Sequence, residues 1–456
     1  MELPSDNEKD TGVSHNAATD VVAGEIHDVD PAWAKKVGLV GQQFSWLSSI
    51  FYFGYLLWEY PTTLLIQKLP VGKYLSGTVV CWGILVACNA ASTNFAGLAT
   101  VRFLLGFMEA TAIPCFVYLV SQWYTRDEAP VRTGTWFVGA DIGSIVCALV
   151  IYGLGHIQGG LEPWRYIFIC FGIITFLWGV IMFFILPDTI RTAKFLTPEE
   201  RAWAEGRVTK DGTGNLDPLI TGSWKPHQVK EAFMDPKNWC IFVIYFLTQI
   251  CNGGLQNFGN LVIKGFGFSP LDTVLFSIPG HFVSSITIWG SGWLSGRYRN
   301  STTWLIMAVL APPLAGSAII YTLEGRGIRL FGYYLLQTGW ASNPLSLALL
   351  ASNNKGATKK MTVTAVLFLG YCAGNIAGPQ FFKATEAPRY NSGFLAVMIC
   401  FGLSMVTPLI LRAYLMHKNR VNAAAFVAED NSAETSSSTD GEDLTDWETK
   451  GFVYRL

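Results

Sequence analysis

The chain has 456 residues with a formal net charge of −1, and 51% of its residues are hydrophobic whereas only 14% are charged. Soluble globular domains carry roughly 25% charged residues, so this composition indicates a polypeptide that lies largely inside a lipid bilayer. The neutral balance gives no basis for a nucleic-acid partner. Nine cysteines are scattered without a CxxC or Cys/His cluster, so we expect no metal, no cofactor and no disulfide framework.

Apolar stretches long enough to cross a bilayer, which needs about 20 residues per helix, follow one another along the chain. Eleven are present, and short polar connections separate all but one pair. The exception, residues 187–237, is rich in Lys, Arg, Glu and Pro and divides the array into two bundles. The predicted helices span residues 44–66, 75–92, 96–119, 132–155, 164–186, 238–263, 271–296, 303–322, 328–350, 361–383 and 393–412.

This pattern predicts an all-α integral membrane protein with five consecutive regions. A polar, acidic and disordered tail over residues 1–43 precedes a first bundle of five helices over residues 44–186. The central loop, residues 187–237, leads to a second bundle of six helices over residues 238–416. Residues 417–456 are polar, and we expect them to form a second disordered tail.

Positive charge in the connections predicts the orientation of the array. Lys and Arg concentrate in alternate connections, twenty on one side against six on the other, so the richer side is predicted to be cytoplasmic. The central loop and the C-terminus then lie inside the cell. The first apolar stretch must begin outside, although the tail before it carries Lys35 and Lys36 and no signal that would take it across.

Internal repetition bears on the odd number of helices. Gly72-Lys73-Tyr74 follows the first predicted helix, and Gly296-Arg297-Tyr298 follows the seventh, 224 residues later. If these segments correspond, the helix at 238–263 has no counterpart in the first bundle. We therefore hypothesise that one helix is absent near Val37-Gly38, through a skipped exon or a faulty gene model; the alternative is a genuine eleven-helix protein.

Charged side chains at membrane depth are costly and usually face a cavity or a partner. Helix 96–119 contains Arg102 and Glu109, which lie two turns apart on one face, with Gly106 on the same stripe. Arg102 is a candidate to hold an anion. Glu109 is a candidate to exchange a proton if burial raises its affinity for one. The alternative is that the two residues only anchor neighbouring helices.

Glu59, Asp141 and His281 are further titratable residues inside predicted helices. Glu59 precedes Pro61 in the first helix, and Asp141 lies in helix 132–155. Either carboxyl is a candidate proton carrier or a partner in helix packing. His281 is alone in an apolar stretch, and we interpret it as a core histidine.

Helix 238–263 carries the clearest polar face, because four amides step along it by three, four and four residues. Amides in a bilayer need partners, and a stripe of four is typical of a solute pathway. Trp340 and Asn343 in helix 328–350, and Asn375 in helix 361–383, are further candidates to contact a planar or polar solute. The four amides are Gln249, Asn252, Gln256 and Asn260.

Motifs of known enzymes are missing from the sequence. There is no HExxH, no GxSxG and no P-loop, so we expect neither an enzyme nor an ATP-driven pump. The energy for any solute movement would then come from an ion gradient or from the gradient of the solute itself.

Several sequence blocks together resemble one known family. In the first half they are Tyr52-Phe53-Gly54-Tyr55 with Tyr60-Pro61, Leu69-Pro70-Val71-Gly72-Lys73-Tyr74, Arg102-Phe103-Leu104-Leu105-Gly106 with Glu109, Trp164-Arg165-Tyr166-Ile167-Phe168 and Leu186-Pro187-Asp188. In the second half they are Gly265-Phe266-Gly267-Phe268-Ser269 and Gly374-Asn375-Ile376-Ala377-Gly378-Pro379-Gln380, followed by Ala387-Pro388-Arg389-Tyr390. Over residues from about 42 to 416, the chain resembles the fungal allantoate permease group, the anion:cation symporter branch of the major facilitator superfamily.

That resemblance implies twelve helices in two six-helix bundles, related by a pseudo-two-fold axis and working by alternating access. It implies a cytoplasmic N-terminus and transport of small carboxylates, including ureides and vitamin precursors, together with protons. Arg102 falls on the arginine of the fourth superfamily helix, which is tied to proton coupling or anion binding. The sequence departs from the family in its absent first helix and in lacking an acid within the loop around Ser295-Gly296-Arg297-Tyr298-Arg299.

We therefore expect a proton-coupled symporter that takes up a small organic anion, as a monomer in the plasma membrane. Arg102 and the amide stripe would hold the solute near the middle of the bilayer, and Glu109 or Glu59 would carry the proton. The alternatives are an exporter of a secondary metabolite in the same fold, a non-transporting membrane sensor, and a helix-deficient product without function.

Overall fold

The computed structural model describes residue 39 and residues 42–124, 129–157, 160–210, 225–298, 300–430, 444–449 and 451–456. All regular structure in this part of the chain is helical, and it contains no β-strand. The predicted all-α fold is therefore confirmed. Val37-Gly38, where we hypothesise an absent helix, and nearly all of the tail over residues 1–43 lie outside the described residues.

The described helices fall into two groups and a short connecting set. The first group is α2 (Gln43–Lys68), α3 (Val71–Asn89), α4 (Phe95–Glu109), α5 (Ala112–Trp123), α6 (Ala129–Leu154) and α7 (Pro163–Ile185). The second group is α11 (Pro236–Gly265), α12 (Pro270–Arg297), α13 (Thr302–Thr322), α14 (Arg326–Leu336), η3 (Gln337–Ala341), α15 (Ser342–Asn353), α16 (Ala357–Ala377), η4 (Gly378–Phe381), η5 (Ala384–Glu386) and α17 (Asn391–Asp430). Between the groups lie η2 (Ile190–Thr192), α8 (Pro198–Lys210) and α10 (Pro226–Met234).

Each of the eleven predicted stretches coincides with a helix or an interrupted helix of the described chain. The stretch 96–119 is divided into α4 and α5, and the stretch 328–350 into α14, η3 and α15. A proline lies just beyond each interruption, Pro114 in α5 and Pro344 in α15. Because proline has no N–H to bond the carbonyl four residues earlier, it weakens the helix at each of these two points, although α2, α12, α13 and α17 continue through internal prolines.

Seven helical spans of the described residues are long and apolar enough to cross a membrane, by length and composition. They correspond to α3, α4 with α5, α7, α11, α13, α16 and α17. Helices α2 and α12, which face the other bundle and carry Glu59 and His281, are not among them, and the apolar part of α6, Gly139–Leu154, is shorter than a full span. Polar residues that face another helix lower the hydropathy of a segment without exposing charge to lipid.

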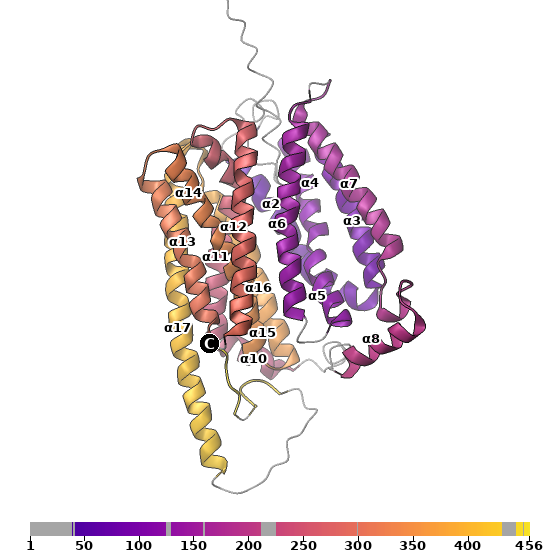
Figure 1. Ribbon diagram of the computed structural model, residues 1–456, viewed down its shortest axis with the longest axis vertical. Helices are drawn as coiled ribbons and strands as arrows, with labels where there is room; N and C mark the ends of the chain where they lie inside the picture. Colours follow the sequence, from indigo (N-terminus) through magenta and orange to yellow (C-terminus); the bar gives the residue numbers. More distant parts are fainter. Residues whose placement is uncertain are drawn as a thin grey trace, which may run out of the picture.

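The two groups of helices form two bundles that stand side by side (Figure 1). Within the first bundle α3 packs on α7 and α2 on α4, and within the second α13 packs on α17 and α11 on α16. The bundles meet where α2 packs against α16 and where α6 packs against α12. The pseudo-two-fold relation implied by the repeated tripeptides makes α2 equivalent to α12 and α6 equivalent to α16. The two interfaces are therefore equivalent under this relation.

The end of the chain differs from the disordered tail expected over residues 417–456. Residues 417–430 continue α17, and residues 444–449 and 451–456, here called the C-terminal segment, lie beneath the second bundle (Figure 1). Asn353 of α15 donates to the carbonyl oxygen of Arg455 at 2.9 Å and accepts from its N–H at 2.7 Å. The N–H of Thr302 in α13 donates to the carbonyl oxygen of Leu456 at 3.0 Å.

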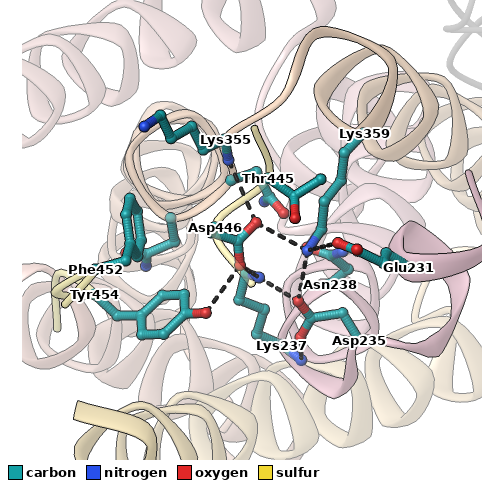
Figure 2. A network of polar contacts seen from close by, with 12 residues as sticks. Glu231, Asp235, Lys237, Asn238, Lys355, Lys359, Thr445, Asp446, Phe452 and Tyr454 are labelled. Carbon is teal, nitrogen blue, oxygen red and sulfur yellow. Dashed lines mark hydrogen bonds and ion pairs between the residues drawn. The ribbon is translucent and has the colours of Figure 1, made fainter. Parts of the chain in front are cut away.

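Buried charge explains why the C-terminal segment is ordered, as Figure 2 shows. Lys237 at the start of α11 and Lys359 at the start of α16 are 1% and 0% exposed. Their Nζ atoms lie 2.6 Å and 2.8 Å from the carboxylate of Asp446, and both also contact Asp235. Burial opposes the charge of Asp446, but the two ammonium groups outweigh it and hold the pKa of that carboxyl below its usual range. Buried charges require partners, and Asp446 supplies one that sequence polarity alone did not reveal.

Candidate functional site

The first half of the site is set by a close crossing of α2 and α4. A Cβ atom at Gly106 would lie 1.9 Å from the carbonyl oxygen of Phe51, and one at Gly54 would lie 2.0 Å from that of Phe103. Only glycine fits at such a crossing. Arg102 lies one turn before Gly106 on α4, and it is 6% exposed, so it is buried within the first bundle.

Acidic and aromatic side chains gather around this crossing. Arg102 lies near enough to Glu109 to attract its carboxylate. Tyr55 of α2 lies close to both Glu59 and Glu109, and it is 2% exposed. Trp58 stacks on Phe107 of α4 at 3.9 Å between ring centroids. The crossing therefore joins the predicted anion-binding and proton-carrying residues in one neighbourhood.

Three buried side-chain polar atoms of α2 at this crossing have no hydrogen-bond partner among the described residues. They are the hydroxyl of Tyr55, Nε1 of Trp58 and Oε2 of Glu59. Unpaired buried polar atoms are rare in folded proteins, and each calls for an explanation such as a missing water or ligand. Because these atoms lie close together, a polar solute that binds near Glu59 could form hydrogen bonds with them.

Tyrosine rings connect the first bundle to the second. Tyr371 of α16 lies 5.7 Å from Tyr55 and 5.9 Å from Tyr52 between ring centroids, and both of these belong to α2. Within the second bundle, Tyr371 also lies 6.4 Å from Tyr245 of α11. Aromatic rings therefore form the contact between α2 and α16 beside Glu59 and Glu109.

Amide side chains form the second half of the site. Gln249 of α11 accepts hydrogen bonds from Asn252 at 2.8 Å and from Asn375 of α16 at 3.1 Å. Its Nε2 donates to Asn343 of α15 at 3.0 Å. Asn375 also donates to the carbonyl oxygen of Tyr371 at 2.9 Å, whereas its own side-chain oxygen is buried without a hydrogen-bond partner among the described residues. The amide cluster (Gln249, Asn252, Asn343 and Asn375) therefore adjoins the tyrosine contact directly.

A close approach of α11 and α16 holds the amide cluster together. A Cβ atom at Gly374 would lie 2.7 Å from Cβ of Gln249, and one at Gly378 would lie 2.3 Å from the carbonyl oxygen of Ile250. The spacing of these glycines in sequence is typical of such a seam. Asn375 directly follows Gly374, so its side-chain amide lies within hydrogen-bond distance of Gln249.

The remaining predicted binding residues have no hydrogen bond to the amide cluster among those that the structure describes. Gln256 is exposed and Asn260 is half-buried, although both share the helix face of Gln249. Trp340 donates from Nε1 to the side-chain oxygen of Gln337 at 2.6 Å within η3. The structure thus brings four of the seven predicted second-bundle residues into hydrogen-bond contact.

The tyrosines and Trp58 were not among the residues predicted for the site. Periodicity gives no signal for them, because aromatic residues are abundant in any membrane helix. The pairing of Tyr55 with Tyr371 depends on two helices from different bundles. A sequence read helix by helix does not contain that information.

His281 differs from the expected solitary core histidine. Its Nδ1 lies 3.3 Å from Oδ1 of Asp141, and Ser285 donates to Oδ2 of the same carboxylate at 3.1 Å. Asp141 belongs to α6 in the first bundle, whereas His281 and Ser285 belong to α12 in the second. The contact therefore joins the two bundles.

Comparison with protein families assigns the chain to a class. The family model of the Major Facilitator Superfamily matches residues 29–379. The chain belongs to the major facilitator superfamily, and it is a multi-pass membrane transporter. Proteins of this superfamily carry small molecules across membranes.

Relatives in fungi confirm the resemblance to the allantoate permease group. The chain is 34% identical over 420 residues to an uncharacterized transporter of Schizosaccharomyces pombe, across 91% of this chain and 81% of that protein. It is 29% identical over 436 residues to the allantoate permease of Saccharomyces cerevisiae, across 91% and 78% of the two chains. A thiamine pathway transporter of Saccharomyces cerevisiae is 30% identical over 365 residues, across 79% and 69%.

Solved structures share the fold. A bacterial homologue of the human lysosomal transporter Spinster, inward-facing and unoccupied, superimposes with a TM-score of 0.61 at 14% identity, covering 88% of this chain and 92% of that one. The proton:xylose symporter XylE, bound to 6-bromo-6-deoxy-D-glucose, gives a TM-score of 0.59 at 11% identity, covering 88% and 90%. These likenesses confirm the major facilitator architecture.

Proposed function

We propose that this transporter takes up a small organic anion together with protons, by exposing the space between its bundles alternately to either side of the membrane. The observation that carries this proposal is the buried cation Arg102 beside Glu109, on the face of α4 that crosses α2. A cation at membrane depth is costly, and an anionic solute lowers that cost.

Each half of the candidate site has a distinct role in this proposal. Arg102 pairs with the carboxylate of the solute through its planar fork of N–H groups. The amide cluster holds the polar remainder of the solute, and Gln256, Asn260 and Trp340 contact it on its way to or from the cluster. Glu109 or Glu59 carries the proton. A nearby cation favours the ionised carboxylate and a nearby anion favours the protonated carboxyl, so binding and release of the solute change the affinity of the carboxyl for a proton.

Two comparisons support the choice of substrate class. The allantoate permease is named for an organic anion and shares 29% of its residues with this chain over nearly the whole length. XylE is titled a proton:xylose symporter, so the same fold accommodates proton coupling. We further propose that the protein works as a monomer in the plasma membrane, as expected from the resemblance.

Uptake by intact cells tests this proposal. Cells that express the protein are given labelled allantoate, a short monocarboxylate and a short dicarboxylate, with and without a protonophore. We expect at least one anion to accumulate and the protonophore to abolish its accumulation. Uptake that is unaffected by collapse of the proton gradient would contradict coupling, and a lowered intracellular level of a solute would favour the exporter.

A further inference from the structure

The interface between α6 and α12 contains a polar contact at the middle of both helices. Asp141 is residue 13 of the 26 in α6, and His281 is residue 12 of the 28 in α12. Nδ1 of His281 lies 3.3 Å from Oδ1 of Asp141, and the Ser285 hydroxyl donates to Oδ2 at 3.1 Å. Both oxygens of one carboxylate are therefore held by the opposite bundle.

This contact lies beside an apolar part of the same interface. Val274 and Ile278 of α12 pack in one apolar cluster with Ile151 and Leu154 of α6. Such packing is non-directional and permits sliding, whereas a charged hydrogen bond is made only at its own distance and angle. The carboxylate thus fixes the register of two helices that apolar contact alone would leave adjustable.

At the second inter-bundle interface, two hydrogen bonds join neutral groups. Ser49 of α2 donates to the carbonyl oxygen of Ile376 in α16 at 2.9 Å and accepts from Gln380 in η4 at 3.0 Å. Neutral hydrogen bonds are weaker than those that include a charged group. The two interfaces, equivalent under the pseudo-two-fold relation, therefore differ in the strength of their polar contact.

We propose that Asp141, His281 and Ser285 form an inter-bundle latch that holds the bundles in the present arrangement and must open during each transport cycle. The proposal rests on the alternating movement of the bundles assumed under the proposed function. Asp141 and His281 act here as positioning residues, because they lie on α6 and α12 rather than at the crossing of α2 and α4 where the solute is proposed to bind.

The population of bundle arrangements tests the latch without any solute. Spin labels are placed at Ile185 of α7 and Val421 of α17, which are 69% and 48% exposed and belong to opposite bundles. The exposed Cys81 and Cys88 are replaced by serine in this background. The distances between the labels are then measured by double electron–electron resonance in D141N, H281Q and the exchange variant D141H/H281D.

We expect D141N and H281Q each to shift the ratio of bundle arrangements about ten-fold or more, the effect of losing one hydrogen bond to a charged group. The exchange variant should return the ratio toward that of the parent. The matched control is S144A, which we expect to leave the ratio unchanged, since among the described residues the Ser144 hydroxyl donates to the carbonyl oxygen of Ala140 within α6.

Ratios within two-fold of the parent in both single variants would overturn the latch. If the single variants do not fold, the exchange variant decides. Its restored folding and parental ratio support the latch, whereas its failure to fold means that the pair only packs the helices. Because no solute is present, an outcome against the latch leaves proton-coupled uptake standing, and the reverse also holds.

Discussion

Buried polar atoms without protein partners are the residue-scale feature on which the transport proposal depends. The hydroxyl of Tyr55, Oε2 of Glu59 and the side-chain oxygen of Asn375 are such atoms within the described chain. Leaving one of them unsatisfied costs about 1–3 kcal/mol. A polar solute that bonds to these atoms would gain hydrogen bonds that the described protein residues do not supply, which would add to its affinity.

Arg102→Lys provides a residue-scale prediction for anion recognition. Lysine keeps the charge but loses the planar fork that pairs with a carboxylate. We expect the KM for the transported anion to rise about 10-fold or more, the loss of one charge-assisted hydrogen bond, while the amount of folded protein stays the same. Initial uptake rates across a range of anion concentrations measure this effect.

The control for this change is Arg389→Lys. Arg389 donates to Glu324 at 2.6 Å in an exposed pair, where both side chains are more than half exposed. Its substitution should leave KM within two-fold of the parent value. An R102K protein with the parental KM would place the solute elsewhere.

Close helix crossings act at the scale of elements. Gly106 and Gly139 lie on α4 and α6, but a Cβ atom at Gly106 would meet the backbone of α2 whereas one at Gly139 would meet no described atom within 4 Å. We expect Gly106→Ala to destabilise the protein by about 1–3 kcal/mol, because overpacking forces the two helices apart.

Gly139→Ala is the matched control and should be neutral or stabilising by about 0.5–1 kcal/mol, since alanine favours the helix. Thermal unfolding in detergent, followed by the loss of the monodisperse peak in size-exclusion chromatography, compares the two variants. Equal stability of both would contradict the close crossing of α2 and α4.

The C-terminal segment provides a second prediction at the scale of elements. Asp446→Asn removes one of the carboxylates that neutralise Lys237 and Lys359, and should cost about 2–3 kcal/mol through the lost charged hydrogen bonds. Thermal unfolding measures the loss. The control, Glu324→Gln, breaks an exposed pair and should change stability by less than about 1 kcal/mol.

The pH dependence of this segment follows from the same carboxyl. The pKa of Asp446 is lowered in the folded protein, so its stabilising contribution is complete above the ordinary Asp pKa of about 3.9 and is lost as pH falls toward the folded value. Proteolytic release of the C-terminal segment should therefore increase on acidification below that range in the parent, and should occur already at neutral pH in D446N. Equal protection of both proteins at neutral pH would contradict the assigned role.

For the molecule as a whole, the sequence determined most of what depends on local patterns. Apolar stretches located each described membrane helix. Contacts between distant segments were not accessible in this way. The Asp141–His281 pair, the tyrosine contact between bundles and the docking of Asp446 each join residues more than one hundred positions apart.

The central claim is that anion and proton cross together, and proton entry driven by the anion tests it most directly. The purified protein is reconstituted into liposomes that contain a pH-sensitive dye, and the transported anion is added outside without an imposed proton gradient. We expect the lumen to acidify in the parent protein and not in the double variant Glu59→Gln/Glu109→Gln. Anion entry without acidification in the parent protein would contradict the account.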